Sequence, residues 1–235
     1  MTSFAVLTDT EKGVKYPLVE EELLPETAIL DPSLLEGVPP KVTADTGMDV
    51  LTHAAEAYVA KGRSPFSDAL AEKAFALAWK NLPAAFNGNQ EDKGRMLLAS
   101  NLAGMAFNGA GLGLSHSMAH ALGGRFHIPH GRLNAMLLPH VIRFNAADRH
   151  TAERYAALAK ACGLTPTARG LAFAIERLRG RLEQPGRLSE CGVEAKQVKA
   201  CGDEIAAAAL ADLCAPSNPR PVTPQDIKAI LRELA

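Results

Sequence analysis

Five of the seven histidines in this chain fall in two short windows, at position 53 and between positions 116 and 130. Asp49 and His53 are four residues apart in TGMDVLTHAAEAY, so a helix would project both side chains from one face. His116 and His120 repeat this spacing in GLGLSHSMAHALGG. A single histidine is most often an ordinary core or surface residue, but so dense a group predicts a shared site. The fold must then bring the two windows together.

The site would be a metal centre if Asp49, His53, His116 and His130 converge. One carboxylate and three imidazoles suit a divalent cation and leave a coordination position open for an oxygen-bearing substrate. With neutral imidazoles the ion would keep a net positive charge, and it would remain a Lewis acid able to lower the pKa of an alcohol. The residue types therefore predict chemistry on an alcohol or a carbonyl compound.

The remaining histidines of the second window are less specific. Pro129 and Gly131 flank His130 and predict a turn there. His127 lies between Phe126 and Ile128, and we expect an exposed or cleft-lining side chain. The alternatives for His127 are that it assists proton transfer or binds the metal in a different coordination geometry.

Strand patterns occur only near the start of the chain. FAVLTD, KYPLV and TAILDP are short apolar runs that predict a small sheet fragment or hairpin. From Pro40 onward the periodicity is helical, with Ser64 and Pro65 as the predicted N-cap and first residue of one helix. Its predicted core stripe consists of Phe75, Trp79, Leu82 and Phe86. A second helix is predicted through Met96 and Phe107 to an end near Gly111, and four or so shorter helices are predicted after Pro139.

Composition excludes several classes of partner. The net charge of −1 gives no electrostatic reason to expect nucleic acid or an anionic membrane surface. No apolar run approaches the roughly 20 residues that a membrane-spanning helix needs, and the first residues lack the pattern of a signal peptide. We therefore expect a cytoplasmic location. The four cysteines, at 162, 191, 201 and 214, form no CxxC pair and are expected to be free thiols.

Three long segments resemble the iron-dependent (group III) alcohol dehydrogenase family: DPSLLEGVPPKVTADTGMDVLTHAAEAYV, LAGMAFNGAGLGLSHSMAHALGG and HIPHGRLNAMLLPHVIRFN. The resemblance extends from TSFAVLTD to the NPR loop at 218–220 and is weakest between about 165 and 200. Within the family, the HIPHG variant is most similar to the alcohol dehydrogenases associated with ethanolamine utilisation. The resemblance implies a mainly α fold, a helical bundle like the α domain of dehydroquinate synthase. Residues 33–235 would form this metal-binding catalytic domain, and residues 1–32 would be remnant strands of a nucleotide-binding domain.

The same resemblance implies a role for each candidate residue. Asp49, His53, His116 and His130 match the family's metal ligands, with Fe²⁺ as the expected ion and Zn²⁺ as an alternative. His120 would lie beside the nicotinamide and the substrate and would serve proton transfer.

Further positions match the cofactor and substrate side. Lys15, Thr2 and Phe4 match positions that contact the dinucleotide or lie next to it. Phe107 and Leu112 are candidate apolar walls of the substrate pocket. The implied reaction interconverts short-chain alcohols and aldehydes with NAD or NADP by metal-assisted hydride transfer.

The family's glycine-rich GGGS and TAGTGSE segments do not occur in these 235 residues, and GLG at 111–113 and GG at 123–124 do not complete a GxGxxG pattern. We therefore expect the C-terminal portion of a larger enzyme. Alone, this portion would be inactive or nearly so and would self-associate through exposed apolar surface into a homo-oligomer. A non-catalytic helical metal-binding or assembly module is the main alternative. A metallohydrolase is less favoured because helical hydrolases commonly carry an adjacent His-Asp pair, which is missing here.

Overall fold

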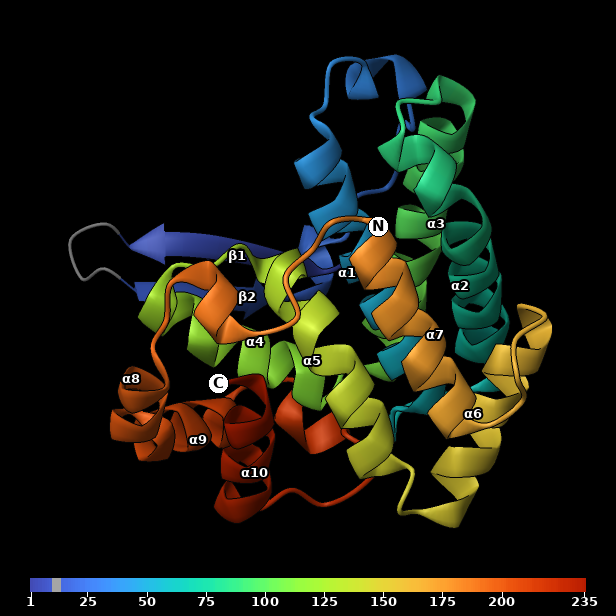
Figure 1. Cartoon of the computed structure of the whole chain (residues 1–235). Helices are drawn as coiled ribbons and strands as arrows, with labels where there is room; N and C mark the ends of the chain where they lie inside the picture. Colours follow the sequence, from blue (N-terminus) through green and yellow to red (C-terminus); the bar gives the residue numbers. More distant parts are fainter. Residues whose placement is uncertain (10–13) are drawn as a thin grey trace.

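The computed structural model describes residues 1–9 and 14–235, and within them the chain is mainly α-helical, as the sequence predicts (Figure 1). The α-helices are α1 (Pro40–Val59), α2 (Pro65–Phe86), α3 (Gln90–Ala110), α4 (Leu114–Phe126), α5 (His130–Asn145), α6 (Arg149–Ala161), α7 (Ala168–Arg181), α8 (Ala195–Ala200), α9 (Gly202–Ala211) and α10 (Pro224–Leu234). Short 3₁₀ turns occur at η1 (Glu21–Leu23), η2 (Pro32–Leu35), η3 (Leu188–Cys191) and η4 (Ala215–Ser217).

Side-chain caps fix many of the helix starts. The Ser64 side chain accepts a hydrogen bond from the Ser67 amide at the start of α2, which confirms the predicted N-cap. Equivalent bonds begin α3, α6, α7 and α10. At the end of α3, Gly111 has φ of 83°, a conformation that favours glycine, and it confirms the predicted helix end.

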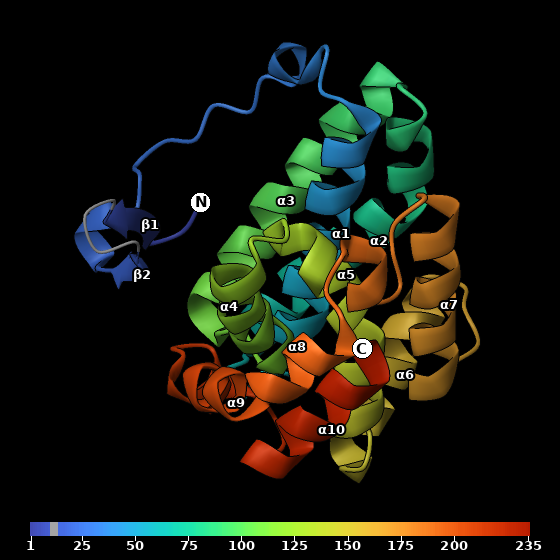
Figure 2. The same cartoon turned by 60° about the vertical axis from the view of Figure 1, so that its left-hand side comes forward.

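The first residues form a two-stranded antiparallel hairpin. β1 (Phe4–Asp9) pairs with β2 (Val14–Val19), with Phe4 opposite Val19. Figure 2 shows this hairpin beside the helical body, joined to it by an extended segment. The third predicted strand, TAILDP at 27–32, is wrong, because the described part of the chain offers these residues no neighbouring strand to pair with. The turn predicted around EKG falls on residues 10–13, which lie outside the described residues.

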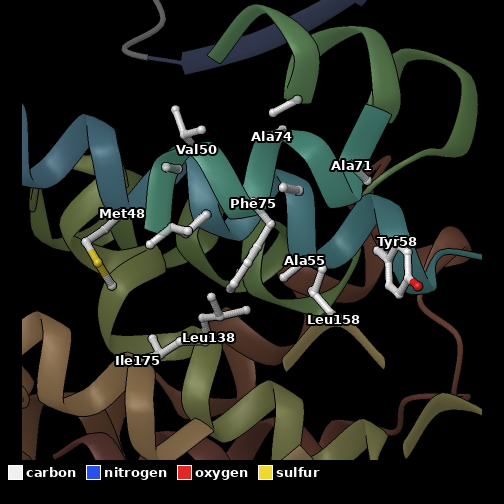
Figure 3. Packing of buried hydrophobic residues seen from close by; sticks show 14 of the residues in the cluster. Met48, Val50, Ala55, Tyr58, Ala71, Ala74, Phe75, Leu138, Leu158 and Ile175 are labelled. Carbon is white, nitrogen blue, oxygen red and sulfur yellow. The ribbon is translucent and has the colours of Figure 1, made fainter. Parts of the chain in front are cut away.

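The helices enclose two clusters of buried apolar side chains. The larger cluster lies among α1, α2, α3, α6 and α7, where Phe75, Leu138 and Ile175 come together (Figure 3). The smaller one lies among α4, α8, α9 and α10. Helix α5 contributes to both clusters, and Pro139 lies inside this helix instead of ending it. In the predicted stripe of α2, Phe75 and Leu82 are fully buried, whereas Trp79 and Phe86 are partly buried.

Helices α1 and α5 approach each other closely at Gly131. A side-chain carbon at this position would overlap the backbone oxygen of Asp45 in α1. The absence of a side chain at Gly131 thus allows the two helices to approach closely beside Asp49 and His130. Among the described residues, the structure contains no helix that is both long and apolar enough to cross a membrane.

Candidate metal centre

Three predicted ligands from three helices meet at one point. Asp49 comes from α1, His116 from the first turn of α4 and His130 from the first residue of α5. One ligand atom from each lies within 4.8 Å of the other two. Oδ1 of Asp49 is 3.7 Å from Nε2 of His116 and 3.5 Å from Nε2 of His130. His130 thus begins a helix, where the sequence predicted a turn.

The His116 ring is buried, and its Nε2 atom has no hydrogen-bond partner. Burial, together with repulsion from His53, lowers the pKa of His116 well below its usual value, so the ring is neutral at pH 7. Burial raises the pKa of Asp49, but attraction to the three histidines and a bond from Asn134 outweigh it and hold that pKa below its usual value. A buried imidazole lone pair beside an ionised carboxylate is a donor set that fits a divalent cation.

His53 lies at the edge of this group, one turn beyond Asp49. Its Nδ1 atom is 4.0 Å from Oδ2 of Asp49, and its ring stacks on that of His116 with 4.4 Å between centroids. On its other side it stacks on Phe107, 4.7 Å away. His53 is therefore adjacent to the three converging ligands and could complete the set as a fourth donor.

A cavity of about 440 Å³ opens beside His53. Thr2, Gly104 and Phe107 are among the residues that line it, and Phe4 packs edge-on against Phe107 at 5.7 Å. The structure thus brings together Thr2, Phe4 and Phe107, which the sequence had placed on the cofactor and substrate side. Leu112 is buried, and it does not line this cavity.

Two other predicted positions are not part of the converging group. The Lys15 side chain lies outside what the structure describes, although its backbone belongs to β2. His127 ends α4 in a left-handed conformation with φ of 55° and is exposed. It lines a different cavity, of about 880 Å³, as expected for a cleft-lining side chain.

Glu56 is a functional candidate that the sequence reasoning missed. This buried carboxylate lies two turns beyond Asp49 on α1, and its Oε2 atom is 2.7 Å from Nδ1 of His116. It also accepts hydrogen bonds from the amides of Gly113 and Ser115, at 2.9 and 2.6 Å. Burial raises the pKa of Glu56 to about 7, although these hydrogen bonds oppose the rise. The spacing of Asp49, His53 and Glu56 on one helix face was the signal available in the sequence.

Two more polar residues support the centre. The Asn134 amide donates to Oδ1 of Asp49 at 2.7 Å and lies 3.0 Å from Nε2 of His130. Asp212, from the end of α9, lies 2.8 Å from Nδ1 of His120. The His120 ring stacks on His130 with 5.0 Å between centroids, so the proposed proton-transfer residue lies next to the ligands.

Comparison with known proteins identifies related sequences and structures. The profile described as "Fe-containing alcohol dehydrogenase family, C-terminal" matches residues 43–235. The 1-propanol dehydrogenase PduQ of Salmonella typhimurium is 48% identical over 243 residues, which cover 100% of this chain and 66% of that protein. The NADPH-dependent butanol dehydrogenase of Clostridium saccharobutylicum is 42% identical and is matched over 98% of this chain and 60% of its own length.

A solved structure shares the fold. The iron-containing alcohol dehydrogenase of Thermococcus thioreducens superposes with a TM-score of 0.93 at 37% identity, over 99% of this chain and 60% of that one. The chain thus spans about three fifths to two thirds of the length of these similar proteins.

Proposed function

Because this chain belongs to the Fe-containing alcohol dehydrogenase family, we propose that it forms the metal-binding catalytic domain of an NAD(P)-dependent alcohol dehydrogenase. The substrates would be short-chain alcohols and aldehydes. The names of the two curated relatives, a 1-propanol and a butanol dehydrogenase, support this substrate class. The narrower resemblance to enzymes of ethanolamine utilisation, which depends on HIPHG, remains a prediction.

The convergence of Asp49, His116 and His130 carries this proposal. These residues, with His53 beside them, would hold one divalent ion, Fe²⁺ by family and Zn²⁺ as the alternative. The unpartnered Nε2 atom of His116 supports it independently, because a buried polar atom without a partner is costly unless a ligand occupies the site. When bound, the ion supplies Lewis acidity, which makes an alcohol more acidic or polarises an aldehyde carbonyl.

The surrounding residues suit the rest of the reaction. His120 is partly exposed, and its Nδ1 atom is held by Asp212, so its ring is oriented for moving a proton between the substrate and solvent. Phe107 and His53 offer a flat wall at the cavity beside the ligands. Thr2 and Phe4 lie on that side, where the nicotinamide would bind. A cytoplasmic location and a homo-oligomeric state are also part of the proposal.

For a polypeptide of these 235 residues alone, we propose metal binding with very slow turnover or none. The reason is that the GGGS and TAGTGSE segments of the family are not among them. Rapid NAD-dependent oxidation of 1-propanol by the purified chain would contradict this statement. Metal binding without turnover, even after the chain is supplied with a relative's nucleotide-binding domain, would favour the non-catalytic module instead.

Crystallography with anomalous scattering at the iron and zinc absorption edges tests the metal site directly. We expect a single anomalous peak bounded by Asp49, His116 and His130, with an edge that identifies the ion. A peak elsewhere, or none in crystals soaked with either metal, would remove the basis of the proposed function.

A further inference from the structure

We propose that Glu56 is the positioning residue of the metal centre: its carboxylate keeps the proton of His116 on Nδ1 and so leaves Nε2 free to face Asp49. The inference deepens the proposed function and depends on it, since a free Nε2 atom matters only if the site binds a cation. Glu56 itself would touch neither the ion nor the substrate. It would act only through His116.

The hydrogen bonds around Glu56 support this assignment. The backbone amides of Gly113 and Ser115 can only donate, and they occupy Oε2 and Oε1 of Glu56. The third close contact is Nδ1 of His116, 2.7 Å from Oε2. The Glu56 carboxylate already accepts hydrogen bonds from two backbone amides. It can accept a third from the His116 ring if the proton of that ring is on Nδ1. Metal-ligating histidines commonly donate their second ring nitrogen to a carboxylate in this way.

The local backbone is shaped to admit this carboxylate. Gly113 is the N-cap of α4, and a side-chain carbon there would lie 2.9 Å from Oε1 of Glu56. The same carbon would lie 2.9 Å from Oδ1 of Asn218, so a larger residue would have to displace one of these side chains, and glycine leaves room for the carboxylate at the first turn of the helix. Because His116 is in that turn, the same contacts fix both the start of α4 and the direction of the ring.

A second residue holds the start of α4 without touching any ligand. Oδ1 of Asn218 accepts a hydrogen bond from the Leu114 amide at 3.2 Å, and its amide group bonds to Asn145 and to the backbone of Arg220. Removing Asn218 should therefore weaken the helix start and the fold, while Glu56 and His116 stay paired. This makes Asn218 a matched control for the structural part of the role of Glu56.

The first test compares Glu56→Gln with Asn218→Ala in the 235-residue chain. Affinity for Zn²⁺ is measured by competition with a chromophoric chelator, Co²⁺ absorption reports the ligand geometry, and the melting temperature reports stability. We expect Glu56→Gln to weaken Zn²⁺ binding about 10- to 100-fold, as loss of such a partner typically does. Asn218→Ala should lower the melting temperature yet bind Zn²⁺ like the unaltered chain. Equal loss of affinity in both variants, or none in Glu56→Gln, would overturn the inference.

The second test needs no folded variant. In the metal-free chain at pH 8.5, ¹⁵N-detected histidine spectra distinguish a ring protonated on Nδ1 from one protonated on Nε2. We expect His116 to carry its proton on Nδ1, and a proton on Nε2 would overturn the assignment. A chain that binds neither Zn²⁺ nor Co²⁺ would refute the proposed function itself, whereas normal binding with the wrong tautomer would refute only the role of Glu56.

Discussion

His120 and Asp212, which are 92 residues apart in sequence, are joined by a 2.8 Å contact between Nδ1 and Oδ2. Burial raises the pKa of Asp212, but hydrogen bonds from His120 and from Cys214 hold it below its usual value. A lowered carboxyl pKa contributes stability above the unfolded-state pKa, and that contribution is lost as the pH falls through the folded-state pKa. The pair should therefore stabilise the fold near neutral pH, and this stabilisation should disappear in acid as Asp212 is protonated.

We predict that His120→Ala raises the pKa of Asp212, because it removes the hydrogen bond and the charge attraction that help to lower this pKa. Carboxyl ¹³C titration of the metal-free chain measures this pKa. His127→Ala is the control, since His127 is exposed and lies outside the ligand group. An unchanged pKa in His120→Ala would mean that the contact does not persist in solution.

Zn²⁺ should stabilise the unaltered chain by about 2.7 kcal/mol when the free ion is present at 100 times its Kd. Asp49→Asn and His130→Gln each remove one converging donor, so most of this stabilisation should disappear in both. Thermal denaturation with and without Zn²⁺ provides the measurement. His127→Gln should respond to Zn²⁺ like the unaltered chain, and a response retained by Asp49→Asn would place the ion elsewhere.

Substitution of two glycines by alanine compares a site where two helices cross closely, Gly131, with a site that has open space around it, Gly124. In Gly131→Ala the new methyl group meets the backbone of Asp45 and approaches Cβ of Asp49 to 3.2 Å. We predict a loss of about 1–3 kcal/mol in unfolding free energy, and weaker Zn²⁺ binding because the helices that carry Asp49 and His130 must separate. Gly124→Ala, in the neighbouring helix α4, adds a methyl group with nothing within 4 Å. It should be neutral, or up to about 1 kcal/mol more stable.

Chemical denaturation across pH tests the ionisation of Glu56 in the metal-free chain. Its folded-state pKa is raised to about 7 from an ordinary value of 4.5. Between these values Glu56 binds its proton more firmly in the folded protein than in the unfolded chain, so its contribution to stability falls as the pH rises from about 4.5 to 7. The lowered pKa values of His116 and His130 act in the opposite direction, so the fall is read from the difference between the unaltered chain and Glu56→Gln. The loss should be of the order of 3 kcal/mol. Glu56→Gln should abolish this fall, and an equally steep fall in that variant would assign it to other groups.

The spacing of Asp49 and His53 and the density of histidines were enough to predict which segments meet, because a helix places residues four apart on one face. Glu56 was missed because a glutamate in an alanine-rich helix is normally a solvent-facing helix former. The structure shows that this one is buried and that it contacts Gly113, Ser115 and His116 at the start of α4. Asp212 and Asn134 act through contacts that the local sequence does not encode. The strand predicted for TAILDP was wrong because a short apolar run forms a strand only where a partner strand lies beside it.

Exposure across the centre is uneven: the His116 side chain is 1% exposed, whereas those of His130 and His120 are 38% and 39% exposed. A cation arriving from water would meet the outer imidazoles first and reach the inner one last. The ion should therefore enter the site, and leave it for a chelator, from the side on which His130 is exposed. Residues at this rim would control how fast the ion exchanges, and the buried side would control how tightly it is held.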